Sequence, residues 1–153
     1  MPVVLICKNR KAWLVFMKNS KLMTQREEDL MEFLWTQENP LTITEMEEIL
    51  DKENWNRVTL FRIVKGLLNK GYLKIYGIER NNTQYARKVM PAITKEEYAA
   101  VLLSERGIKS SSLGKIALAM LGTGKRKKTS HDEEEKLVKE LEDMITKIRN
   151  QEE

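Results

Sequence analysis

Apolar residues recur with helical periodicity in residues 55–73, and this stretch predicts the helix around which the rest of the chain is arranged. Its apolar positions, which fall on one face, are Leu60, Ile63, Val64, Leu67 and Leu68. At 100° per residue, the opposite face carries Val58, Arg62, Lys65 and Asn69 and no acidic residue. Asn56 is suited to cap the start of this helix, and Gly71 is suited to end it in a left-handed conformation.

Two shorter helical patterns precede this stretch and two strand-like runs follow it. The first has apolar positions at Leu30, Met31, Phe33, Leu34 and Trp35, and the second at Ile43, Met46, Ile49 and Leu50. Residues 72–89 predict two strands around a polar turn, and residues 41–43 can pair with them as a short third strand. Three helices followed by a hairpin are the order of a winged helix-turn-helix domain, so we expect a mainly α (α+β) fold.

After residue 92 the apolar positions form three helical stripes. The first contains Tyr98, Val101 and Leu102, the second Leu113, Ile116, Ala117, Met120 and Leu121, and the third Leu137, Leu141, Met144, Ile145 and Ile148. The third stripe is narrow and lies in a segment otherwise rich in Lys and Glu, which favours pairing with a partner helix. We expect residues 21–92 to form the winged domain and residues 93–153 a helical dimerisation domain. The alternative is that these helices fold back onto the winged domain.

Helix starts are marked by capping boxes, in which a Thr or Ser is followed three residues later by a Glu. Thr24, Thr94 and Ser130 each fit this pattern. For the short second helix two boxes compete, one starting at Thr44 and the other at Thr42, so its first residue stays open.

Charge is distributed unevenly along the chain, although the net charge is only +4. Residues 21–54 hold 3 Lys/Arg and 10 Asp/Glu, whereas residues 55–90 hold 8 Lys/Arg and a single acid, Glu79. The positive charge therefore gathers on the predicted third helix and hairpin, where it favours contact with nucleic acid. The alternative is that the acidic and basic halves of one domain pair their charges.

Residues 1–20 differ from the rest, with two apolar runs, four cations and no acid. They are too short and interrupted for the ~20 residues of a membrane span and lack the features of a signal peptide. We expect a β-hairpin leader that lies on the domain, a strand exchanged within a dimer, or a translation start at Met17 or Met23. The single cysteine, Cys7, excludes an intramolecular disulfide and favours a cytoplasmic protein.

Several segments, in the same order and spacing, resemble the penicillinase-repressor family of bacteria (BlaI/MecI-like, with the copper-responsive repressor CopY as a relative). The matching segments are EEDLMEFLW, PLTITEMEEIL, W-N-x-x-T-L…L-x-K-G-Y-L, ER…QYARKV and SSLGKIALAML. The resemblance runs from about Leu22 onward and implies a dimeric transcriptional repressor that binds double-stranded DNA at an inverted-repeat operator.

The resemblance implies that Thr59 and Arg62 reach base edges, and that the second and third stripes form the dimer interface. The interface residues expected are Leu113, Ile116, Met120, Leu137, Leu141, Met144, Ile145 and Ile148. Asn56, Arg57, Lys65 and Asn69 are expected mainly on phosphates, and Arg80 and Asn81 at the hairpin tip on backbone or minor groove. Arg62 and Gly66 stand where close relatives carry Thr and Arg, so a different operator sequence is expected.

No enzyme is predicted, since the only histidine, His131, and Cys7 lie far apart in the sequence. No metal or other cofactor is expected either, because the chain lacks the paired cysteines of the copper-responsive relatives. A sensor protease stays an open partner, but the Asn-Phe dipeptide cleaved in the family is absent. Two rival functions are a winged-helix module that binds protein through an apolar patch such as Phe61, and a regulator that binds a small molecule beside Tyr98 and Met120.

Overall fold

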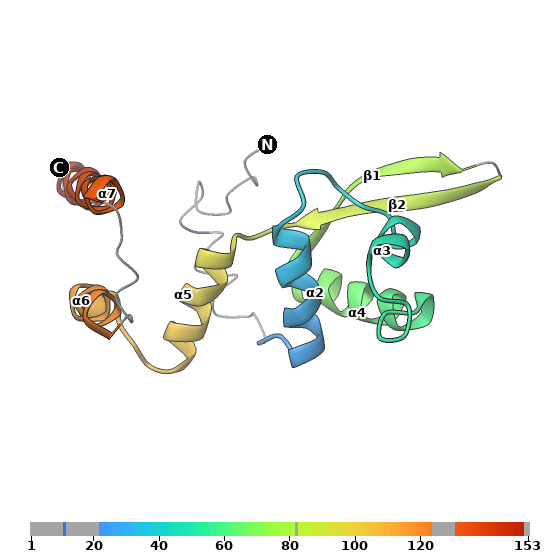
Figure 1. Ribbon diagram of the computed structural model, residues 1–153, viewed down its shortest axis with the longest axis horizontal. Helices are drawn as coiled ribbons and strands as arrows, with labels where there is room; N and C mark the ends of the chain where they lie inside the picture. Colours follow the sequence, from blue (N-terminus) through green and yellow to red (C-terminus); the bar gives the residue numbers. More distant parts are fainter. Residues whose placement is uncertain (1–10, 12–21, 82, 124–130, 152–153) are drawn as a thin grey trace. The chain divides into compact units, whose positions relative to one another are not determined.

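The computed structural model describes residues 11, 22–81, 83–123 and 131–151, which belong to two compact units, Met1–Ile108 and Lys109–Glu153. The first contains α2 (Gln25–Trp35), α3 (Ile43–Ile49), α4 (Arg57–Lys70), β1 (Leu73–Asn81), β2 (Gln84–Pro91) and α5 (Lys95–Glu105) (Figure 1). The second contains the short 3-10 helix η2 (Ser110–Ser112), α6 (Leu113–Thr123) and α7 (His131–Asn150). The leader hairpin predicted within residues 1–20 lies outside the described residues.

The first unit is a winged helix, as the sequence predicted. Helices α2, α3 and α4 lie together, and the β1–β2 hairpin extends away from them as the wing (Figure 1). The strands pair antiparallel from Leu73 opposite Pro91 to Asn81 opposite Gln84, with an irregularity between Ile75 and Gly77. In place of the third strand predicted at residues 41–43, the structure has a single β-bridge between Leu41 and Val89. These two residues exchange two backbone hydrogen bonds of 3.1 and 2.9 Å.

The core of the winged helix comes from the apolar faces that the periodicity identified. Its fully buried side chains include Leu30, Met31, Leu34, Met46, Leu60 and Leu67. Phe33, Trp35, Leu50 and Leu68 are only partly buried against it. Ile49, an apolar position of the second helical pattern, is 57% exposed at the end of the short helix α3.

Helix α5 also packs into this core. Tyr98 and Val101 are buried, and the Tyr98 ring meets Tyr72 edge-on with 5.5 Å between centroids. The Trp35 indole N–H donates to the Ile93 carbonyl oxygen at 2.9 Å, just before α5 begins. The first apolar stripe thus packs on the winged domain, and the compact units divide after Ile108.

Capping boxes begin three of the described helices. Thr24 and Thr94 form the boxes predicted for α2 and α5. Of the two capping boxes predicted for α3, the structure contains the one that starts at Thr42. The Thr42 side chain accepts from the Glu45 N–H, and the Glu45 carboxylate accepts from the Thr42 N–H. Ser130 lies outside the described residues.

In the second unit the apolar side chains of α6 and α7 are largely uncovered in the single chain. Exposed positions are Leu113, Leu118, Met120, Leu137, Val138, Met144, Ile145 and Ile148, while Ile116 and Leu141 are half-buried. Across the described residues, none of the helices combines the length and apolar character needed to cross a membrane.

Candidate nucleic-acid interface

A groove of about 1170 Å³ lies between helix α4 and the wing. Its lining residues are Ile43, Thr44, Arg57, Phe61, Val64, Lys65, Leu68, Asn69, Ile75, Thr83, Gln84, Tyr85, Ala86, Arg87 and Val89. Three of these are cations and, in the part of the chain that the structure describes, none is acidic. A helix face and a wing with this charge form a surface suited to a polyanion.

The start of α4 is fixed by contacts from two directions. The Asn56 side-chain oxygen caps the helix by accepting from the Thr59 N–H at 2.9 Å, as predicted. Arg26 of α2 stacks over the Trp55 ring at 4.7 Å and donates to the Asn54 carbonyl oxygen at 2.8 Å. These contacts hold the first turn of α4 in place, and first-turn residues of such helices reach base edges in the groove.

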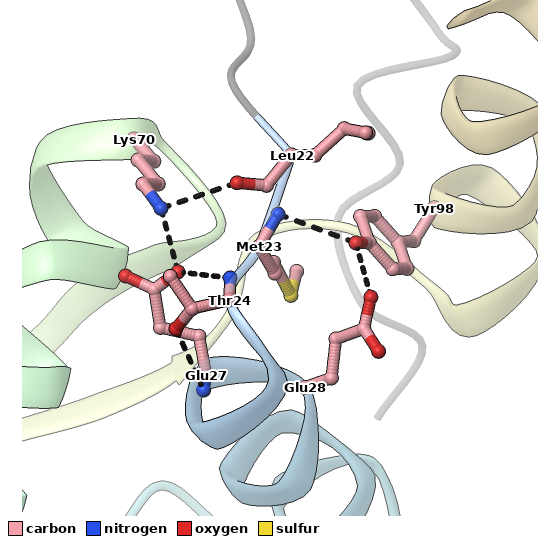
Figure 2. Close-up of polar contacts among 7 residues, drawn as sticks. All are labelled: Leu22, Met23, Thr24, Glu27, Glu28, Lys70 and Tyr98. Carbon is pink, nitrogen blue, oxygen red and sulfur yellow. Dashed lines mark hydrogen bonds and ion pairs between the residues drawn. The ribbon is translucent and has the colours of Figure 1, made fainter.

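The end of α4 is anchored to the start of α2. The Lys70 ammonium donates to a Glu27 carboxylate oxygen at 2.6 Å and to the Leu22 carbonyl oxygen at 3.2 Å (Figure 2). The same carboxylate oxygen accepts from the Thr24 N–H at 2.7 Å. Burial opposes ionisation of Glu27, but the hydrogen bonds from Lys70 and Thr24 and the Lys70 charge outweigh it and lower the pKa of Glu27.

Tyr98 joins helix α5 to the same segment. Its hydroxyl accepts from the Met23 N–H at 3.3 Å and donates to a Glu28 carboxylate oxygen at 2.7 Å (Figure 2). Burial and the Glu28 acceptor raise the pKa of Tyr98, so the hydroxyl stays protonated and keeps its role as a donor. Residues 22–28 thus connect the far end of α4 with α5.

The predicted DNA-binding residues occupy different parts of this surface. Arg57, Lys65 and Asn69 are exposed and line the groove. Arg62 is exposed on α4 but is not part of the groove lining, and Thr59 is half-buried.

The two predicted residues of the wing lie at the end of β1. Arg80 is exposed and pairs with Tyr85, while Asn81 is the last residue of β1 and pairs with Gln84. Arg80 is not among the residues that line the groove, which the opposite strand approaches with residues 84–87.

Thr44, Tyr85 and Arg87 also line the groove, although none of them was predicted as a DNA-binding residue. Strand alternation was the available signal for two of them, because positions 85 and 87 share a face with Val89. Lys88 points to the other face, where its ammonium lies 3.2 Å from a Glu79 carboxylate oxygen and 3.9 Å from one of Glu45. Arg87 therefore lines the groove, whereas Lys88 forms ion pairs with Glu79 and Glu45 on the other face of the strand.

The penicillinase repressor family matches the chain over residues 23–143, which spans the winged helix and most of the second unit. The chain belongs to the penicillinase repressor family. Members are DNA-binding transcriptional repressors, which agrees with the cationic groove and confirms the resemblance found in the sequence. No individual curated protein matches the chain significantly.

Metal binding finds no support in the geometry of the described residues. Among them, no group of three or more His, Cys, Asp or Glu side chains is arranged to hold an ion. The acidic residues at the start of α2, such as Glu27 and Glu28, instead accept hydrogen bonds from Lys70, Thr24 and Tyr98.

Proposed function

We propose that this member of the penicillinase repressor family is a homodimeric repressor that binds an inverted-repeat operator through α4 and the wing. The observation that carries the proposal is the groove between them, which is lined by Arg57, Lys65 and Arg87 and, among the described residues, by no acidic side chain. Helix α4 would enter the major groove, and the wing would contact the adjacent DNA backbone.

Within this proposal, side chains divide into those that read bases and those that contact the backbone. Arg62, exposed one turn into α4, would bind guanine O6 and N7 bidentately, and Thr59 would contact a neighbouring base edge. Phosphates would be contacted by Asn56, Arg57, Lys65, Asn69 and Arg87. Arg80 and Asn81 would meet the backbone or the minor groove from the end of the wing.

The second unit supports the homodimer part of the proposal. In α7, Met144, Ile145 and Ile148 are 44%, 51% and 57% exposed in the single chain. An apolar stripe of this kind, on a helix whose other faces are charged, is stabilised when a second copy covers it. Two winged helices joined in this way would read two half-sites related by a twofold axis.

Selection from a library of random duplexes tests the function directly. We expect enrichment of a palindromic sequence, and an affinity for it that falls steeply and linearly on a log–log plot against salt concentration. Recovery of no preferred sequence, together with binding that is insensitive to salt, would instead favour a protein-binding module. The observation that favours a protein-binding module is the exposed Phe61, an apolar side chain on the surface of α4.

A further inference from the structure

Two apolar side chains stand on the cationic face of α4. Val58 is 80% exposed and Phe61 is 60% exposed, although both lie on a helix whose other apolar residues form the core. Three cations surround them in the sequence, namely Arg57, Arg62 and Lys65.

The fold leaves both residues more than half exposed. A β-branched residue such as Val58 lowers helix propensity slightly, and at 80% exposure it buries almost no apolar surface. Phe61 lines the groove beside the wing and lies four residues from both Arg57 and Lys65, so it shares their side of the helix. Both residues therefore face the space that the operator would occupy.

In the major groove of B-DNA, the C5-methyl group of thymine is the apolar feature among the hydrogen-bonding groups of the base edges. We propose that Val58 and Phe61 recognise thymine methyl groups in the operator. This inference rests on the proposed function, and it assigns base selectivity to two residues that carry no hydrogen-bonding group. Contact with a methyl group would remove apolar surface of both partners from water.

The position of Val58 also specifies where its thymine should lie. Val58 and Arg62 are four residues apart on one helix, which places their Cβ atoms about 5–6 Å apart. This distance corresponds to one or two base-pair steps of about 3.4 Å along a strand. The thymine recognised by Val58 is thus expected within two base pairs of the guanine recognised by Arg62.

The surrounding charge argues for DNA over a protein as the occupant of this patch. Val58 and Phe61 stand among the cations Arg57, Arg62 and Lys65, and the exposed Ile75 and Tyr85 of the wing line the same groove as Phe61. The cations are complementary to the phosphates on both sides of a major groove.

The test replaces each thymine of the selected operator, one at a time, with deoxyuridine, which removes the methyl group and leaves the hydrogen-bonding edge unchanged. For the full chain we expect about fourfold weaker binding at one or two thymines in each half-site, the effect of burying one methyl group. Val58→Ala should abolish the uracil effect at one of these positions, and Phe61→Ala should abolish it at another.

Two control variants make the result specific. Arg62→Ala should weaken binding but keep the uracil effects, whereas Ile49→Ala, at an exposed position of α3 outside the groove, should leave affinity and uracil effects unchanged. Equal affinity for thymine and uracil at every position would overturn the inference, as would full uracil effects in both Val58→Ala and Phe61→Ala. Selective binding of DNA in those cases would leave the proposed function standing, whereas failure to select any operator would overturn the function itself.

Discussion

At the scale of single residues, Glu27 connects three parts of the winged helix. Its carboxylate completes the capping box of α2, accepts the Lys70 ammonium of α4, and lies against Gly66. A buried carboxylate is costly unless it is paired, and here hydrogen bonds and an ion pair satisfy it. Its protonation state therefore affects how firmly the far end of α4 is held.

The lowered pKa of Glu27 predicts acid-sensitive stability. A carboxylate whose pKa in the folded state lies below its ordinary value stabilises the fold above that value, and the contribution is lost as the pH falls through the folded pKa. We expect the Tm to fall as the pH is lowered below 4.5, the ordinary value for glutamate. Glu27→Gln should lower the Tm at neutral pH and flatten its dependence on acid.

Glu32→Gln is the matched control, because the Glu32–Lys95 ion pair is exposed and such pairs contribute little. Thermal unfolding followed by circular dichroism across this pH range measures both variants. Equal acid sensitivity of the wild type and Glu27→Gln would contradict the assignment.

The second prediction concerns Gly66 in the interior of α4. Replacing a glycine inside a helix with alanine usually stabilises the folded protein by about 0.5–1 kcal/mol. Here a Cβ atom would lie 2.8 Å from a Glu27 carboxylate oxygen, whose partner oxygen is held by Lys70 and Thr24. We expect Gly66→Ala to destabilise the wild type but to stabilise a Glu27→Ala background. Urea unfolding of the four proteins measures the coupling, and an equal gain in both backgrounds would show that Glu27 moves aside freely.

At the scale of elements, α4 and the wing should make different contributions to DNA binding. A bidentate Arg–guanine contact discriminates by roughly 1–3 kcal/mol, whereas a phosphate contact carries no direct sequence information. Arg62→Ala should therefore relax preference at one base pair of each half-site. Arg80→Ala and Arg87→Ala should weaken binding to operator and random DNA alike, and each should reduce the salt slope by about one for every phosphate that is no longer neutralised.

This division is measured with single-base operator variants at fixed salt, followed by salt titrations. If the base-preference profile of Arg62→Ala matches that of the wild type, base reading must be reassigned to Thr59 and its neighbours. If Arg87→Ala leaves the salt slope unchanged, Arg87 does not contact the DNA backbone.

At the scale of the whole molecule, the packing of α5 predicts where the chain can be shortened. Tyr98 is 5% exposed and Val101 1% exposed, and removing two such side chains costs roughly 3–6 kcal/mol. This is comparable to the total stability of a small domain, about 5–15 kcal/mol. A fragment ending at Ile108 should unfold cooperatively, while one ending at Ala92 should be largely unfolded. Equal Tm values for the two fragments would contradict the assignment of α5 to the winged helix.

The apolar stripe of α7 predicts the oligomeric state. Leu141→Asp combined with Ile145→Asp should convert the proposed dimer into monomers in sedimentation experiments, because two charges would be buried without partners. Lys139→Asp combined with Thr146→Asp places the same number of carboxylates on the opposite face of α7 and should leave the dimer intact. A dimer that survives the first pair of substitutions would place the interface elsewhere.

The order and type of the elements in the winged helix follow from the amino-acid sequence alone. Helical periodicity, the Thr24 and Thr94 capping boxes and the left-handed Gly71 are local features, and local interactions set them. The cationic face of α4 and its capped start were likewise readable from spacing, because both depend on positions within one helix.

Which surfaces meet, in contrast, depends on tertiary packing. Periodicity identifies an apolar face but not what covers it, so the Tyr98 stripe was equally compatible with a dimer partner and with the core that it joins. The entry of Arg87 into the groove depends on how the hairpin faces α4, and the Glu27–Lys70 pair joins residues 43 positions apart. Such contacts arise from the packing of whole elements, which no single segment specifies.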